Sequence, residues 1–163
     1  MKYNLIRKMD ISNGPGVRVS VFMQGCEFHC KNCFNSNTWS FDDGEDFTET
    51  TIDKVLELCK PDYIKGLSIL GGEPMHPRNI EATTKLAKAF KEKYPNKSIW
   101  LYTGGMWEDV KQMQLMEYLD VLVDGEFVVE KKDVNLHWVG SSNQRVINVP
   151  ETLEKGKIIY HES

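Results

Sequence analysis

The sequence predicts an α/β fold built on a mainly parallel sheet, because three features occur together along the chain. Short apolar runs alternate with stretches of helical periodicity. The length of 163 residues is that of about one domain, and no repeat, low-complexity tract or linker composition divides it. Glycine directly follows several of the apolar runs. We therefore expect residues 1–163 to form a single domain in which helical crossovers cover a parallel sheet.

The expected elements follow one another regularly from residue 17 onward. VRVSVFM (17–23) alternates and is rich in β-branched residues after the turn signal NGPG, so we expect the first strand here. TETTIDKVLELCK (48–60) has an apolar helical face, threonine caps from Thr48 to Thr51, and Pro61 to end it. Further strands are expected at 65–70, 97–102 and 118–124, and further helices at 79–94 and 106–116.

Glycines mark the carboxyl ends of the last three expected strands: Gly71-Gly72, Gly104-Gly105 and Gly125. Each alone is typical of a simple turn. Ligands of parallel α/β folds bind at the carboxyl ends of strands, where glycine lets the main chain approach a ligand closely. Three successive strand ends of this kind indicate a binding site there.

Charge and hydropathy exclude two classes of partner. Lys and Arg total 20 against 24 Asp and Glu, which gives a net charge of −4 and offers no basic stripe to nucleic acid. The N-terminal stretch lacks the apolar core of a signal peptide, and no apolar run approaches the length of a membrane span. We expect a cytoplasmic protein that binds neither nucleic acid nor membrane.

The segment QGCEFHCKNCFN (24–35) places Cys26, Cys30 and Cys33 within one short loop. A disulfide framework is disfavoured, because the cytoplasm is reducing and three close cysteines leave one unpaired. Structural zinc wants four ligands, normally as two separated pairs. A zinc-stabilised interaction protein nevertheless remains an alternative, with the histidines as possible fourth ligands: His29, His76 and His137.

Thiolates also hold iron-sulfur clusters, and a four-iron cluster ordinarily takes four of them. Three close cysteines would leave one iron open to a substrate or cofactor. The only other cysteine, Cys59, lies on the apolar face of an expected helix, where we interpret it as a small core side chain.

The spacing CEFHCKNC resembles that of the radical S-adenosylmethionine superfamily, and GGEP (71–74) resembles the motif with which that superfamily meets the methionine amino group. The chain as a whole is similar to the family of proteins that activate anaerobic ribonucleoside-triphosphate reductases. The matching segments run from near one end to the other: 13–39, 71–79, 99–104, 120–127 and 140–147.

The resemblance implies the reaction. Cys26, Cys30 and Cys33 would hold a 4Fe-4S cluster whose fourth iron binds S-adenosylmethionine. The reduced cluster would cleave this cofactor to a 5′-deoxyadenosyl radical, which takes a hydrogen atom from a glycine of the reductase. Gly25 and the amides of residues 29–34 would donate hydrogen bonds to cluster sulfurs.

The resemblance also implies cofactor contacts. Where the superfamily has an aromatic residue before the third cysteine this chain has Asn32, so the contacts there are expected from main-chain groups of Asn32, Cys33 and Phe34. Glu73 has the charge to receive the methionine ammonium. Other residues expected near the cofactor are Gly71, Gly72, Thr103, Gly104 and, at the ribose, Asp124.

The implied partners are the large, glycyl-radical subunit of the reductase and an electron donor such as flavodoxin, with a possible homodimer inside a heterotetramer. Other readings are an activase of the pyruvate formate-lyase type or a radical enzyme that acts on a small molecule. The implied fold is a partial, open βα barrel, because a complete one needs about 250 residues. The reductase would insert its glycine through this opening to reach the radical.

Two further expectations concern side chains outside these motifs. Arg18 is expected to be a solvated surface charge, available for partner docking. The tryptophans are expected in the core or at its edge rather than in a cofactor box: Trp39, Trp100, Trp107 and Trp138. The segment GSSNQRV (140–146) is expected only to shape the mouth of the site.

Overall fold

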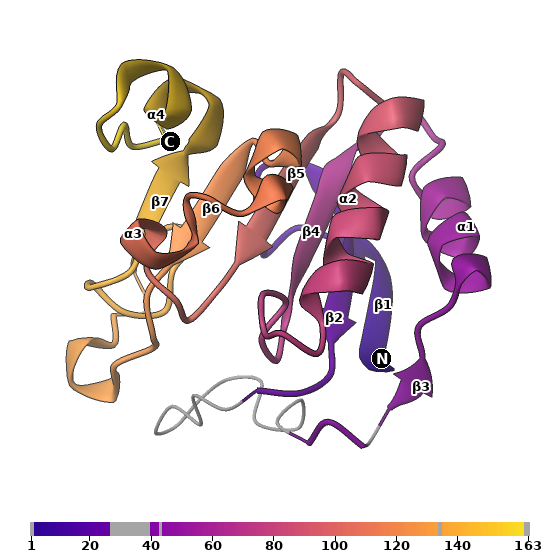
Figure 1. The fold of residues 1–163 in the computed structure, drawn as a ribbon, viewed down its shortest axis with the longest axis horizontal. Helices are drawn as coiled ribbons and strands as arrows, with labels where there is room; N and C mark the ends of the chain where they lie inside the picture. Colours follow the sequence, from indigo (N-terminus) through magenta and orange to yellow (C-terminus); the bar gives the residue numbers. More distant parts are fainter. Residues whose placement is uncertain (1, 27–39, 43, 134, 162–163) are drawn as a thin grey trace.

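A computed structural model describes residues 2–26, 40–42, 44–133 and 135–161. Its strands form one open seven-stranded sheet in the order β3-β1-β2-β4-β5-β6-β7 (Figure 1). The strands are β1 (Lys2–Asp10), β2 (Val17–Met23), β3 (Glu45–Asp46), β4 (Ile64–Gly71), β5 (Ser98–Tyr102), β6 (Val121–Asp124) and β7 (Arg145–Asn148). The central block β2-β4-β5-β6 is parallel, whereas β1, β3 and β7 pair antiparallel at the two sides. The predicted α/β class is therefore confirmed.

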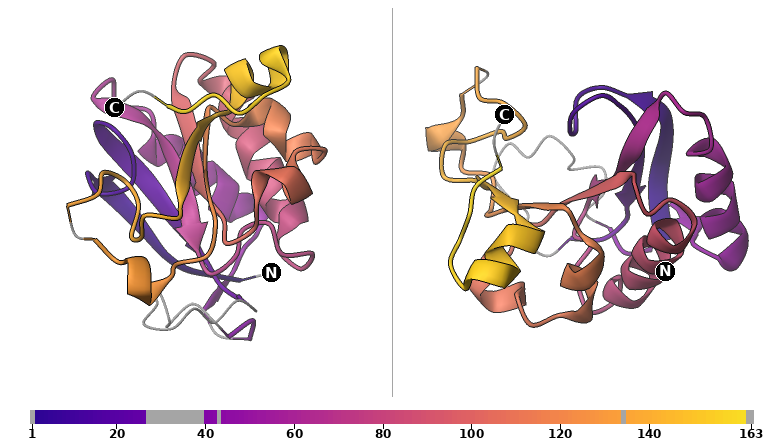
Figure 2. Two further views of the ribbon diagram at one scale, coloured as in Figure 1. Left: turned by 90° about the vertical axis from the view of Figure 1, so that its left-hand side faces the viewer. Right: turned by 90° about the horizontal axis from the view of Figure 1, so that it is seen from above.

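The helices are α1 (Glu49–Leu58), α2 (Ile80–Lys93), α3 (Trp107–Val110) and α4 (Val149–Lys155), with 3-10 turns η2 (Gln114–Tyr118) and η3 (Val129–Lys131). Thr48 caps α1 in a reciprocal capping box with Thr51, as the threonine cluster predicted. Helices α1 and α2 lie on the outer side of the curved sheet (Figure 2).

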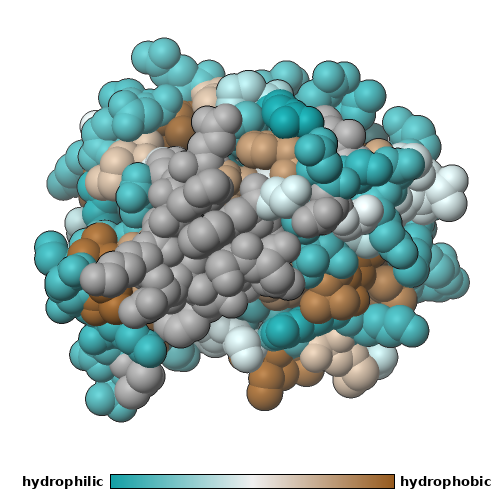
Figure 3. Space-filling model, turned by 90° about the horizontal axis from the view of Figure 1, so that it is seen from below, coloured by the Kyte–Doolittle hydropathy of each residue, from teal (hydrophilic) through white to brown (hydrophobic). Residues whose placement is uncertain are grey.

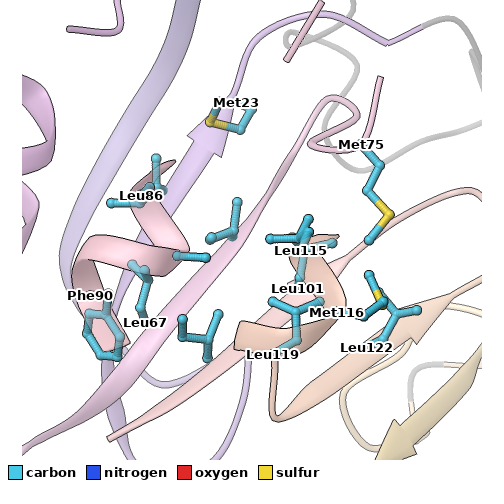
Figure 4. Packing of buried hydrophobic residues seen from close by; sticks show 14 of the residues in the cluster. Met23, Leu67, Met75, Leu86, Phe90, Leu101, Leu115, Met116, Leu119 and Leu122 are labelled. Atoms are coloured by element: carbon cyan, nitrogen blue, oxygen red, sulfur yellow. The ribbon is translucent and has the colours of Figure 1, made fainter. Parts of the chain in front are cut away.

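The main hydrophobic core fills the space between the sheet and these helices. Alternate residues of β2 face it, namely Val19, Val21 and Met23, and Leu86 and Phe90 of α2 pack against the same sheet face (Figure 4). Cys59 belongs to this core and is fully buried, as expected. Trp100 and Trp107 are buried as well, in agreement with their predicted role.

The opposite, concave face of β2 carries the polar side chains of Arg18 and Ser20 together with Phe22. Arg18 is fully buried there, so the prediction of a solvated docking residue is wrong. Five hydrogen bonds satisfy its guanidinium; the acceptors are Ser68 Oγ, Ser98 Oγ, Ser98 O, Leu67 O and Pro15 O. Burial lowers the pKa of Arg18 to about 10, which still leaves it charged at neutral pH.

Three element predictions need correction. The first strand of the chain is β1, which the sequence pattern missed, and not the strand at 17–23. Residues 7–9 of β1 are all exposed, so β1 lacks the regular alternation of buried and exposed residues that identifies a strand. The helix expected over 106–116 divides into α3 and η2, because Met113 takes an extended conformation that turns Leu115 and Met116 into the core. The sequence pattern also missed β3, β7 and α4.

No helix among the described residues is both long and apolar enough to cross a bilayer.

The buried Asp10 at the end of β1 generates a prediction about acid stability. Its carboxylate accepts hydrogen bonds from Ser12 N (2.8 Å), Asn13 Nδ2 (2.7 Å) and Ser20 Oγ (2.6 Å). Burial alone raises the pKa of Asp10, but these hydrogen bonds outweigh it and the net pKa is lowered. At pH 7 we expect Asp10→Asn to reduce the free energy of unfolding by about 1–3 kcal/mol.

Because the folded-state pKa of Asp10 is lowered, its stabilisation is present above the unfolded pKa of about 3.9 and disappears as the pH falls through the folded value. The stability difference between the two proteins should therefore shrink below pH ~4. Urea unfolding at several pH values measures it, and a difference that is constant from pH 7 to pH 3 would contradict the assignment.

Candidate functional site

A cavity of about 500 Å³ opens on the concave face where the parallel strands end. Figure 3 shows this end of the molecule, where the described surface is mainly hydrophilic. Residues that follow all four parallel strands line the cavity: Cys26 after β2, Gly72 and Glu73 after β4, Thr103 and Gly104 after β5, and Gly125 after β6. The structure thus brings together the strand ends that the glycine pattern singled out. The volume lies within the range of small-molecule sites.

Gly71 lets β2 and β4 approach each other at the edge of the cavity. Its φ of +114° favours glycine, and a Cβ there would lie 2.6 Å from the main-chain N and O of Met23. The next amide, Gly72 N, donates to Met23 O at 2.9 Å. At Gly71 the cavity wall therefore consists of main chain, because any side chain there would collide with the main chain of Met23.

Cys26 is the described member of the predicted ligand set. It is buried, lines the cavity and follows Gly25, whose carbonyl accepts a 2.7 Å hydrogen bond from Glu73 N. The other residues predicted for the loop lie outside the described part of the chain: His29, Cys30, Asn32, Cys33, Phe34 and Trp39.

The Glu73 carboxylate joins the ends of two strands. Oε2 accepts hydrogen bonds from Met75 N (2.9 Å) and Thr103 Oγ1 (2.7 Å), and Oε1 accepts one from Gly104 N (2.7 Å). Burial raises the pKa of Glu73, and these donors oppose the rise without cancelling it. Glu73 is therefore a buried carboxyl group on the cavity wall, and its position depends on Thr103 and Gly104.

Asp124 is placed differently from the other predicted cofactor residues. It is fully buried and is not among the residues that line the cavity. Its carboxylate binds Arg145 in a bidentate pair of 3.0 and 2.5 Å and also accepts a 2.8 Å hydrogen bond from Trp107 N. Arg145 continues to Glu108 at 2.9 Å, and these two acidic groups raise the pKa of Arg145.

The segment GSSNQRV forms the far wall of the cavity. Gln144 donates from Nε2 to Gly125 O and accepts at Oε1 from Gly140 N and Ser141 N. Asn143 Nδ2 donates to Glu126 O at 2.8 Å. These bonds tie the segment to the residues after β6, and both Gly140 and Gln144 line the cavity.

Sequence reasoning missed several cavity residues. They include Arg7, Ser12, Asn13, Phe22, Tyr102 and Trp138. The signal for two of them was present, because Phe22 and Tyr102 fall on the strand face opposite to Val21 and Leu101, which point to the core. Trp138 has a φ of +71°, unusual for a residue with a side chain, and packs edge-on against Trp100.

The distant zinc ligands considered from sequence have other contacts. His76 Nδ1 accepts from Arg78 N at 3.1 Å, and the His137 ring stacks on Trp138 at 4.0 Å. Within the described ranges, no group of three or more His, Cys, Asp or Glu side chains is arranged to hold a metal ion.

Comparison with known proteins connects this cavity to an iron-sulfur family. A family model described as a 4Fe-4S single cluster domain matches residues 12–147. The chain belongs to this family. The match includes the cysteine loop and every strand from β2 to β6, so the family's cluster domain and the cavity occupy the same part of the fold.

Curated relatives of similar length carry one shared name, anaerobic ribonucleoside-triphosphate reductase-activating protein. The relative from Vibrio cholerae is 43% identical over 148 residues, which are 88% of this chain and 96% of that protein. Those from Enterobacteria phage T4 and Escherichia coli K12 are each 39% identical, over 90% of this chain and 93% and 97% of theirs.

Within a 4Fe-4S protein, the core position of Cys59 predicts that it is not a cluster ligand. Burial raises its pKa to about 12, which disfavours the thiolate that binds iron. We expect Cys59→Ala to retain the full iron content and to lose about 1–2 kcal/mol of unfolding free energy through lost packing. Iron analysis after anaerobic reconstitution, with calorimetry, tests both parts, and loss of iron in this variant would overturn the assignment.

The three donors around Glu73 predict a large effect of an isosteric change. In Glu73→Gln the amide NH₂ group must face at least one donor among Met75 N, Thr103 Oγ1 and Gly104 N. We expect a loss of about 1–3 kcal/mol of unfolding free energy. Glu81→Gln is the control, since Glu81 is exposed and forms an i,i+4 pair with Lys85 on the surface of α2. Equal stability of the two variants in urea would show that the donors do not hold Glu73.

Proposed function

We propose that this protein activates an anaerobic ribonucleoside-triphosphate reductase by generating a glycyl radical on it, and that it does so as a radical S-adenosylmethionine oxidoreductase. The observation that carries the proposal is the cavity itself. It places Cys26 of a 4Fe-4S family member beside the buried carboxyl group of Glu73 and a wall of strand-end glycines. The names of the relatives supply the partner.

The donor set fits a 4Fe-4S cluster. Cys26 is a buried soft ligand on the cavity wall, and Cys30 and Cys33 are proposed as the other two ligands. When bound, the cluster and S-adenosylmethionine supply the one-electron cleavage that yields a 5′-deoxyadenosyl radical and, from it, a glycyl radical on the partner. The comparisons do not support the alternative of a zinc-stabilised interaction protein, since the matched family is one of iron-sulfur proteins.

Glu73 is proposed to bind the ammonium group of S-adenosylmethionine. Each carboxylate oxygen has about two acceptor positions, and Oε1 uses one of them for Gly104 N. Oε1 can therefore accept a hydrogen bond from an ammonium group without breaking the strand-end contacts. A cation beside Glu73 also favours its ionised form, which opposes the rise of pKa that burial causes.

The remaining cofactor contacts are proposed from bare main chain. Gly71, Gly72 and Gly104 present no side chains to a ligand, and main-chain groups of Asn32, Cys33 and Phe34 are proposed to complete the site. Both carboxylate oxygens of Asp124 already accept hydrogen bonds from Arg145, so Asp124 could bind the ribose hydroxyls of the cofactor only in addition to Arg145. Its contacts favour a positioning role, in which Asp124 holds the far wall of the cavity through Arg145.

We propose that the curved sheet is a partial βα barrel whose opening admits the glycine-bearing segment of the reductase. The sheet order leaves β3 and β7 at opposite ends, and the cavity lies on the concave side between them. A cytoplasmic location, a donor such as flavodoxin and a homodimer within a heterotetramer complete the proposal.

An anaerobic assay with two candidate partners tests this function. The reconstituted protein, S-adenosylmethionine and a one-electron reductant are incubated with the reductase or with a pyruvate formate-lyase. We expect 5′-deoxyadenosine release and a glycyl radical signal in electron paramagnetic resonance with the reductase alone. Cys30→Ala should abolish both, because the cluster loses a ligand.

A radical on pyruvate formate-lyase and none on the reductase would replace the proposed partner by that type of enzyme. Protein that binds one zinc and no iron after anaerobic purification would refute the enzymatic proposal altogether.

A further inference from the structure

Phe41 lies where the described chain resumes after the cysteine-bearing loop, and it packs against the segment that follows β4. Its ring centroid is 4.4 Å from that of His76, with the two planes inclined by 50°. The Arg78 guanidinium lies 4.5 Å from the Phe41 ring centroid, within the range of a cation–π contact. Both partners belong to the short connection between β4 and α2.

The same ring contacts Gly25, on the other side of the cysteine-bearing loop. A Cβ placed on Gly25 would lie 2.1 Å from Cδ1 of Phe41, and the φ of Gly25 is +104°. Glycine is therefore required by the close approach of the ring as well as by the main chain. Residues 25 and 41, which precede and follow the loop, are in direct contact.

This contact belongs to the connection that carries Glu73. Gly25 O accepts the amide of Glu73, and His76 N donates to Glu73 O at 3.2 Å. The Phe41 ring thus packs beside main-chain hydrogen bonds that join Gly25, Glu73 and His76, and Gly25 is the residue immediately before Cys26. The ring and the Glu73 amide therefore both contact Gly25, the residue that precedes Cys26.

We propose that Phe41 is a positioning residue for the iron-sulfur cluster, because its ring fixes the main chain at Gly25, directly before the proposed ligand Cys26. Fixing a ligand costs conformational entropy, and a contact that already holds the main chain beside Cys26 reduces the entropy that cluster binding must overcome. The ring therefore favours uptake of iron and opposes its loss. Phe41 touches neither iron nor substrate in this role.

The surroundings of Phe41 distinguish it from a core side chain. The two hydrophobic core clusters of the described residues do not include it, and its named neighbours are a glycine, an imidazole and a guanidinium. Phe47 offers a matched comparison, since it is also a partly buried phenylalanine but packs against the main core and against Tyr3. Removal of Phe47 should affect the fold, whereas removal of Phe41 should affect the cluster.

The test compares iron retention with fold stability in Phe41→Ala, Phe41→Tyr and Phe47→Ala. Each full-length protein is reconstituted anaerobically, and the rate of iron loss to an excess of chelator is followed by the decay of the cluster absorbance. We expect Phe41→Ala to lose iron about tenfold faster than the unmodified protein, as for other groups that orient metal ligands. Phe41→Tyr, which keeps the ring, should restore the original rate.

The melting temperature before reconstitution supplies the second measurement. We expect it to fall in Phe47→Ala and to change little in Phe41→Ala. Iron loss from Phe41→Ala that is no faster than from Phe47→Ala, or no rescue by tyrosine, would overturn the proposal.

If Phe41→Ala fails to fold, Arg78→Gln is used instead, because Arg78 is exposed and its guanidinium packs on the Phe41 ring. Faster iron loss from Arg78→Gln supports the proposal, and an unchanged rate in a folded protein contradicts it. None of these measurements uses S-adenosylmethionine or the reductase, so they succeed or fail independently of the proposed activity.

Discussion

Glu73 connects the carboxyl ends of three parallel strands, and the geometry of the cavity depends on this connection. Its main-chain amide binds Gly25 after β2, while its carboxylate binds Thr103 and Gly104 after β5. Glu73 itself follows β4. A buried carboxyl group is costly unless its oxygens accept hydrogen bonds, and here both oxygens do. The strand ends are held in place by the same bonds that make the burial of Glu73 tolerable.

The opposite end of the concave face is closed by a second polar network. All five N–H groups of the Arg18 guanidinium donate hydrogen bonds, and none of the acceptors is a carboxylate. Ser68 accepts one of them and donates in turn to Asn13 O, in the hairpin loop between β1 and β2 (residues 11–16). Asp10 binds Asn13 and Ser20 from the other side of that loop. Networks of this kind are stable only when every member is satisfied, which rigidifies the segment involved. The hairpin residues Ser12 and Asn13 therefore form a firm wall of the cavity.

Local patterns in the sequence were sufficient for the elements whose signals are local. The alternation of VRVSVFM predicted β2 at its observed bounds, and the threonine cluster predicted the cap of α1. Arg18 was misassigned because its acceptors at Ser68 and Ser98 lie 50 and 80 residues away, and no periodicity reports such partners. The convergence of the strand-end glycines followed from parallel topology, whereas the donors that hold Glu73 did not. The ring contact of Phe41 with Gly25 was equally hidden, because a glycine in a loop gives no sign of what approaches it.

Different kinds of contact hold the two walls of the cavity in place. The difference follows from the residues that form the wall beside β2 and β4 and those that form the wall beside β6 and β7. On the side of β2 and β4 the chain comes close to bare glycine, so a ring and main-chain amides provide the contacts. On the side of β6 and β7 the segment 140–144 has little apolar area to bury. Its position is fixed instead by Gln144, Asn143 and the bidentate pair of Arg145 with Asp124. The polar residues of GSSNQR thus act through the main chain of residues 125–128, and they place Gly125 and Gly140 on the cavity without presenting a reactive group to it.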